Sequence, residues 1–276
     1  MATLSRSWQL VKTAWQVLRA DTELLVFPLI SGIGALLIAL AFAVPTFMLS
    51  AAGGDEILFY VLLFLYYLVL YAVTIFSNTA LIGAAMIRLR GGNPTLRDGF
   101  GVAFSRLGSI AGYALIAATV GVILQALSNQ GTLGRVVRSL IGVAWNLVTF
   151  LVVPVLVVED VGPIEAVKRS GALLRRTWGE QIAGGVGMGL VFFLFFLLAA
   201  LLTGAGIWLG VAVNSTALIV VFALAGVIAL IALSLIGSAL KGIYAAAVYR
   251  YAADGEVGEQ FPTELIRNAF RPVTQA

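Results

Sequence analysis

Six long apolar runs, almost free of charge, dominate the chain. They extend over Leu24–Leu49, Ile57–Ile87, Leu107–Leu127, Ser139–Val158, Ile182–Val213 and Ala217–Tyr249. Each run reaches the roughly 20 residues that an α-helix needs to cross a hydrocarbon layer about 30 Å thick. The pattern therefore predicts an all-α membrane protein with six transmembrane helices.

Three of these runs exceed 30 residues and are longer than a bilayer requires. We expect such helices to tilt, kink or project beyond the membrane, with interruptions at the glycine-rich stretches Gly184–Gly189 and Gly204–Gly210. Pro154 should bend the fourth helix near its end, because proline cannot donate the backbone hydrogen bond of a helix interior.

Basic residues fall almost entirely on one side of the predicted helices. Of the 17 Lys and Arg residues, only Arg135 and Arg138 lie on the other side, in the loop between the third and fourth runs. The positive-inside rule then places both the N-terminus and the C-terminus in the cytoplasm.

Two shorter segments carry an apolar stripe at helical spacing. The stripe of the first segment consists of Leu4, Trp8, Val11, Trp15 and Leu18, opposite Arg6, Gln9, Thr13 and Gln16. The stripe of the second consists of Ile164, Val167, Gly171, Leu174 and Trp178, and Glu165 is placed to pair with Arg169. Basic residues beside tryptophan are typical of helices that lie along a membrane surface. The expected interfacial anchors are Trp8, Trp15, Trp178, Lys168, Arg169, Arg175 and Arg176. Connectors packed against the helix bundle are an equal alternative.

These two segments also indicate an internal repeat. The pattern Arg-Ser-x-x-Leu-Val-Lys-x-x-Trp from Arg6 to Trp15 returns in conservative form from Arg169 to Trp178, 163 residues later. Ala84–Arg88 returns as Ala246–Arg250 at nearly the same offset. We expect one membrane domain, 1–276, built from a first repeat unit (1–106), an inserted helix pair (107–158) and a second unit (159–276). The repeat is parallel, because both units begin and end on the same side.

Several motifs resemble an uncharacterised bacterial family of six-span integral membrane proteins. They are Phe76–Leu81, Gly92–Gly99, Tyr249–Ala252, and the stretch from Trp145 through Pro154, Glu159, Gly162–Pro163 and Lys168–Ser170 to Trp178–Gly179. The Pro154–Trp178 segment is also distantly similar to the membrane domain fused to some glycerophosphodiester phosphodiesterases, whose catalytic part has no counterpart in this sequence. The resemblance implies the helical architecture and a bacterial inner membrane, and it implies no activity.

The composition removes most catalytic chemistry. The chain has no Cys and no His, and only 11% of its residues are charged. It therefore lacks thiol nucleophiles, imidazole bases and Cys/His metal sites. The 13 carboxylates lie outside the runs, so no paired intramembrane acids relay protons or hold a coupling cation. We expect no enzyme activity and no cofactor, and the absence of a basic face with aromatics argues against nucleic acid.

Lys241 is the single charge inside a run and gives the candidate polar site within the membrane. Under the repeat it corresponds to Thr79, beside Asn78, and Asn146 and Thr149 of the fourth run fall at a similar depth. A cation beside amides and hydroxyls suits an anionic headgroup or a permeating anion, whereas snorkelling of Lys241 towards the inner interface is an equal alternative. Ser238 and Lys241 also form a possible Ser-Lys pair, but no oxyanion feature accompanies it.

The expected function is therefore that of a non-enzymatic membrane protein that binds lipid or a membrane partner at the cytoplasmic leaflet. Self-association is a further possibility for the partner. The alternative function is a channel or transporter for a small, anionic solute.

Overall fold

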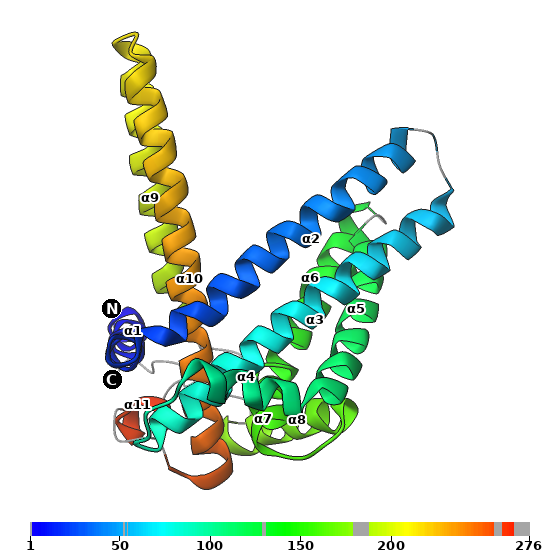
Figure 1. Ribbon diagram of the computed structural model, residues 1–276, viewed down its shortest axis with the longest axis vertical. Helices are drawn as coiled ribbons and strands as arrows, with labels where there is room; N and C mark the ends of the chain where they lie inside the picture. The colour runs from blue at the N-terminus through cyan, green and yellow to red at the C-terminus, as the bar shows by residue number, and fades with distance from the viewer. Residues whose placement is uncertain are drawn as a thin grey trace.

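The computed structural model describes residues 2–51, 53, 55–128, 131–178, 188–256 and 261–267, which form helices joined by turns and short irregular connections (Figure 1). The elements are α1 (Ala2–Ala20), η1 (Thr22–Leu25), α2 (Val26–Ala51), α3 (Glu56–Leu89), α4 (Leu96–Ser105), α5 (Leu107–Ser128), α6 (Gly131–Val148), α7 (Val152–Val158), α8 (Pro163–Trp178), α9 (Met188–Ala212), α10 (Thr216–Asp254) and α11 (Thr263–Arg267). Six helical segments are long and apolar enough to cross a membrane. The predicted all-α, six-span architecture is therefore confirmed.

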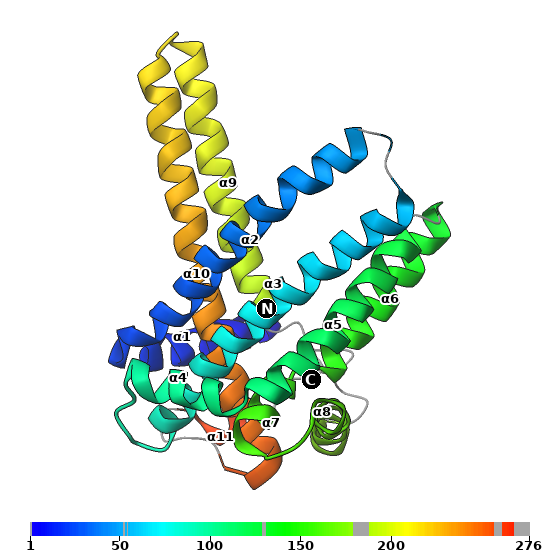
Figure 2. The same cartoon turned by 45° about the vertical axis from the view of Figure 1, so that its right-hand side comes forward.

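The spans form two groups that meet at one end and splay apart towards the other (Figures 1 and 2). Helices α9 and α10 pair as a hairpin, while α2, α3, α5 and α6 form the second group. The end where the groups meet carries the shorter helices α1, α4, α7, α8 and α11, and we call it the base. The opposite end, with the turns after α2, α5 and α9, is the loop end.

Helices α3 and α10 hold the two groups together at the base. Both helices carry small buried residues in their lower halves, among them Ala84 and Ala85 of α3 and Ala239, Gly242 and Ala246 of α10. A Cβ atom on Gly242 would lie only 2.5 Å from Leu81 Cδ2. Glycine at this position therefore lets the two backbones approach closely, as small residues do in membrane helix pairs.

The connection from α3 to α4 is a tightly built corner. Gly91 adopts φ +82°, a left-handed conformation that glycine reaches without a steric penalty. Thr95 and Asp98 then form a reciprocal capping box at the start of α4. A Cβ atom on Gly99 would lie 2.7 Å from the carbonyl oxygen of Ala80, so glycine seats α4 directly on the α3 backbone.

The fourth span breaks just before Pro154, and this confirms the predicted bend. Helix α6 ends at Val148 and α7 begins at Val152. The buried hydroxyl of Ser170, in α8, donates to the carbonyl of Val148 at 2.6 Å and accepts from the amide of Leu151 at 3.0 Å. One side chain thus satisfies two backbone groups that the break leaves without helical partners.

The limits of the fourth span and the course of the fifth differ from the expectation. The fourth candidate span runs over Leu133–Val158 and includes Arg135 and Arg138, so Lys241 is not the only charge within the spans. The predicted run begins after Arg138 because it is defined by the absence of charged residues. The helix nevertheless continues through both arginines towards the loop end, because the residues around them are apolar. Helix α9 continues without a break through Gly204 and Gly210. Residues 184–187 lie outside the described part of the chain.

Candidate functional site

Three of the five predicted polar residues line one cavity of about 740 Å³ between α3, α5 and α6. They are Asn78 of α3, Asn146 of α6 and Thr149, in the turn that follows α6. Each of the three helices contributes residues at helical spacing, so each turns one face to the cavity. The lining residues are Tyr71, Thr74, Ile75, Asn78, Tyr113, Ala117, Leu124, Arg135, Arg138, Ser139, Gly142, Val143, Trp145, Asn146, Thr149 and Val153.

Two arginines give this cavity, which we call the α6 cavity, a positive charge. Arg135 and Arg138 lie one turn apart on α6, towards the loop end, and no Asp or Glu occurs among the lining residues. Among the described residues, no carboxylate forms an ion pair with Arg138. Deeper in the cavity, the hydroxyl of Thr149 donates to the carbonyl of Trp145 at 2.7 Å.

The arginines and the two tyrosines of this cavity escaped the sequence analysis, although α6 carries a readable signal. Arg135, Arg138, Ser139, Gly142 and Asn146 recur at intervals of three and four residues and form a polar stripe on one helix face. Averaging hydropathy along the run conceals such a stripe, because leucine and valine occupy the other faces.

Thr79 and Lys241 do not line the α6 cavity. Thr79 is fully buried and its hydroxyl donates to the carbonyl of Ile75 at 2.8 Å within α3. Lys241 is exposed, and its neighbour Leu240 lines a groove against α1 at the base. The position of Leu240 beside α1 places Lys241 at the level of α1, at the base. Lys241 is absent from the residues that line the cavity with Asn78 and Asn146, so its expected approach to them stays a prediction.

The groove that Leu240 lines forms a second site, which we call the α1 groove, with a volume of about 320 Å³. Trp8, Lys12 and Trp15 of α1 line it from one side. Apolar residues of α9 and α10 line it from the other, namely Phe192, Phe195, Leu233, Ile236 and Leu240. The tryptophans are half-exposed, at 50% for Trp8 and 37% for Trp15. The rings of Trp8 and Phe195 lie 6.1 Å apart, so tryptophan forms the rim of an apolar floor.

Helix α1 is rotated relative to the expected stripe. Leu10, Val11, Ala14, Val17 and Leu18 are buried against the bundle, together with Thr13, which the sequence pattern placed on the polar face. The tryptophans consequently lie at the edge of the buried face, beside Lys12. Aliphatic side chains pack more closely against helix backbones, which leaves the larger amphipathic rings at the rim.

Helix α8 crosses the base beneath α5 and α6 (Figure 2). Arg169 pairs with Glu159 at 3.1 Å instead of the expected Glu165, and Glu165 lies 4.0 Å from Lys168. The hydroxyl of Tyr249 also donates to Glu159, at 3.0 Å. Glu159, at the end of α7, therefore joins α8 through Arg169 and α10 through Tyr249.

The structure describes the side chains of two of the three remaining expected anchors on α8, Arg175 and Arg176. Arg175 and Arg176 are exposed near the end of α8. The side chain of Trp178 lies outside the described part of the chain.

Asp21 is the one carboxylic acid buried at the base among the described residues. Its Oδ2 atom has no hydrogen-bond partner in this part of the chain. Burial raises the pKa of the Asp21 carboxyl, although the positive charge of Arg88 partly opposes the increase. Among the described residues, no cluster of acidic side chains has the geometry to hold a metal ion.

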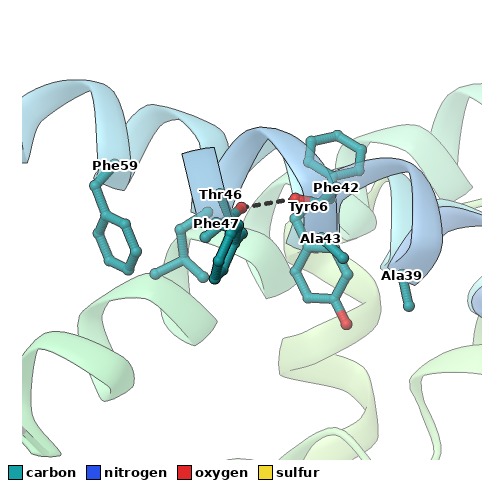
Figure 3. Close-up of a pocket in the computed structure, with 8 residues that line it drawn as sticks. Ala39, Phe42, Ala43, Thr46, Phe47, Phe59 and Tyr66 are labelled. Carbon is teal, nitrogen blue, oxygen red and sulfur yellow. Dashed lines mark hydrogen bonds between the residues drawn. The ribbon is translucent and has the colours of Figure 1, made fainter. Parts of the chain in front are cut away.

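A third hollow lies between α2 and α3 near the loop end and has a volume of about 420 Å³ (Figure 3). Its lining residues are Ala39, Phe42, Ala43, Thr46, Phe47, Phe59, Leu63 and Tyr66. The rings of Phe42 and Tyr66 meet edge to face, and the hydroxyl of Thr46 donates to the carbonyl of Phe42. No charged residue lines this hollow, so it offers hydrocarbon contact and no ionic recognition.

The protein has six apolar spans, and large hydrophobic side chains are exposed along them. These features define a multi-pass helical membrane protein. The chain belongs to DUF6159, a family of unknown function whose profile matches residues 57–260. No curated protein matches the chain.

Proposed function

We propose that this protein is a non-enzymatic membrane protein that binds an anionic phospholipid at the cytoplasmic leaflet of a bacterial inner membrane. The observation that carries the proposal is the α1 groove, where Lys12 lies between two half-exposed tryptophans above an apolar floor. A lysine amine attracts a lipid phosphate, tryptophan favours the headgroup region, and apolar side chains accept an acyl chain.

The size of the α1 groove favours a lipid chain over a protein helix. A volume of about 320 Å³ is small for an α-helix, whose diameter with side chains is about 10–12 Å. Helix α1 crosses the foot of the α9–α10 hairpin (Figures 1 and 2). The residues that line the groove come from these three helices. An acyl chain lying along α9 and α10 would place its headgroup beside Lys12.

Basic residues support the orientation in which the base faces the cytoplasm. Lys12 and Arg19 of α1, Arg97 of α4 and Lys168 of α8 belong to the base and are exposed. At the loop end, the described part of the chain carries Arg135 and Arg138, which line a cavity. The positive-inside rule assigns the more basic end to the cytoplasm.

We propose further that the chain is a duplicated unit with an inserted pair of spans. Each unit consists of a surface helix, two long helices and a short helix, which are α1, α2, α3 and α4 in the first copy and α8, α9, α10 and α11 in the second. The equivalent helices α3 and α10 pack against each other. The distant similarity to the membrane domain of glycerophosphodiester phosphodiesterases stays a prediction.

Brominated lipids test the proposed lipid site. The full chain is reconstituted with Trp15 as its sole tryptophan, in bilayers of phosphatidylcholine that contain brominated phosphatidylglycerol or brominated phosphatidylcholine. We expect stronger quenching of Trp15 by the brominated anionic lipid. Lys12→Gln should reduce that preference several-fold, because it removes the cation and leaves the apolar floor.

Two matched controls separate lipid binding from general effects. Arg19→Gln removes an exposed cation from the same helix outside the groove and should keep the preference. Leu233→Phe narrows the groove and should weaken quenching, whereas Ile231→Phe alters an outward-facing position of α10 and should not. Equal quenching by both lipids, or an equal effect of Lys12→Gln and Arg19→Gln, would contradict the proposal. A dimer or a second protein seated on the groove would also contradict it, by shielding Trp15 from both lipids.

A further inference from the structure

We infer that the α6 cavity is a second binding site, specific for a phosphate-type oxyanion. It lies on different helices from the α1 groove, and its recognition chemistry does not depend on the lipid site at the base. The ligand is a phosphate group, carried either by a lipid headgroup or by free inorganic phosphate.

The sign of the charge within the cavity selects an anion. Arg135 and Arg138 are the charged residues that line it, and they lie one turn apart on α6 so that their side chains extend from the same face. Guanidinium groups bind phosphate through paired N–H donors in a planar fork. Both arginines are exposed and line the cavity, so a ligand can reach them. A charge within a candidate membrane span is costly, and the position of both arginines on the face that lines the cavity favours a binding function.

Polar groups continue the cavity inward from the arginines. Asn78 and Asn146 add amide groups from two different helices, and Ser139 adds a hydroxyl one turn from Arg135. Asn146 lies 11 residues after Arg135 on α6, about 17 Å along the helix. The donors therefore form a continuous series from the loop end towards the middle of the span, and they offer a phosphate group several contacts along the cavity.

Gly142 gives the cavity its width at the centre of this series. It lines the cavity, and a Cβ atom built on it would meet no other atom within 4 Å. The first carbon of a larger side chain at this position therefore meets no neighbour, and the side chain would occupy part of the cavity. This geometry supplies a variant that blocks the site without altering its charge.

Binding measurements with the full chain test the inference. The protein, purified in a neutral maltoside detergent, is measured by equilibrium dialysis against radiolabelled inorganic phosphate. Retention of phosphatidylglycerol or phosphatidylcholine is measured in parallel by native mass spectrometry. We expect saturable binding of phosphate, of phosphatidylglycerol, or of both, and little retention of phosphatidylcholine beyond that of the controls.

The variants then assign binding to the α6 cavity. Replacing both arginines, Arg135→Gln with Arg138→Gln, should weaken binding by about tenfold or more, because two charge-assisted contacts are lost. Gly142→Leu should abolish phosphate binding without changing net charge. Combined with Lys12→Gln, which disables the α1 groove, it should also abolish the remaining preference for phosphatidylglycerol. The matched control is Arg19→Gln with Arg97→Gln, which removes the same charge from exposed positions outside the cavity and should bind as the wild type does.

Each outcome supports or overturns the inference. Loss of phosphate binding in the cavity variants identifies free oxyanion as the ligand, and loss of phosphatidylglycerol alone identifies the lipid headgroup. Absence of both from the wild type, or equal binding by wild type and Gly142→Leu, overturns the site. If the double arginine variant fails to fold, Gly142→Leu carries the test. Lys12→Gln should leave phosphate binding intact, so failure of the α1 groove and failure of this site are distinguishable.

Discussion

The hydroxyl oxygen of Ser170 lies 3.0 Å from the amide nitrogen of Leu151 and replaces the backbone acceptor that this amide would have in a continuous helix. The same oxygen donates to the carbonyl of Val148, so α8 is fastened to the fourth span at the point where the span breaks. A buried break of this kind is stable only when its free backbone groups are hydrogen-bonded.

Ser170→Ala should therefore destabilise the protein by about 2 kcal/mol or more, because it leaves a donor and an acceptor buried without partners. Unfolding of the detergent-solubilised protein measures the effect. Ser105→Ala is the control, since the hydroxyl of Ser105 is exposed and bonds only within α4. Equal stability of the two variants would show that the break needs no side-chain partner.

A pair of glycines in α4 tests the seating of this helix on α3. Gly99→Ala should destabilise the protein by about 1–3 kcal/mol, the range for overpacked cores, because the new methyl group meets the immovable carbonyl of Ala80. Gly101→Ala, two residues further on, meets no atom within 4 Å and should stabilise the helix by about 0.5–1 kcal/mol. Thermal unfolding of both variants gives the comparison. A stabilising effect of Gly99→Ala would disprove the close approach.

Asp21 gives the stability a specific pH dependence. Because burial raises the pKa of its carboxyl in the folded protein, the ionised form destabilises the fold, and this cost disappears as the pH falls through the raised pKa. Asp21→Asn should therefore unfold at a higher temperature than the wild type at pH 7, and the difference should shrink towards pH 4. Glu165→Gln, at an exposed position of α8, should show no such narrowing. A widening difference at low pH would reverse the assignment.

The orientation can be tested by cysteine labelling, since the chain contains no native cysteine. Ala51→Cys, at the loop end, should react with an impermeant thiol reagent added to intact spheroplasts. Asn93→Cys, at the base, should react only after the membrane is permeabilised. Ala51 is exposed at the end of α2 and Asn93 is exposed in the connection from α3 to α4, so access to the reagent decides the outcome. Labelling of Asn93→Cys from outside would invert the proposed topology.

The sequence predicted the spans well because the length of an apolar run reports directly on whether a helix can cross a bilayer. The bend at Pro154 followed for an equally local reason, the missing amide donor of proline. The α6 cavity was only partly accessible. Asn78, Asn146 and Thr149 were found by their polarity. Tyr71 and Tyr113 look like ordinary span residues in the sequence, because only the packing of three helices shows that they line the cavity.

Other differences arise from packing choices that periodicity leaves open. The pattern of α1 fits two neighbouring rotations, and the structure has the one that buries Ala14 and Val17 and leaves Trp15 at the rim. The sequence offers Arg169 two acidic partners, Glu159 and Glu165, and in the fold Arg169 pairs with Glu159. Such choices depend on contacts between distant parts of the chain, which a single sequence does not reveal.

The unbroken length of α10 has a mechanical consequence. Its 39 residues extend over about 58 Å, and one end pairs with α9 while the other contacts both α1 and α3. A bilayer that thins or thickens changes the tilt of such a rod instead of compressing it. Because the foot of the rod contacts α1, we expect a change of tilt to shift the position of α1 relative to α10.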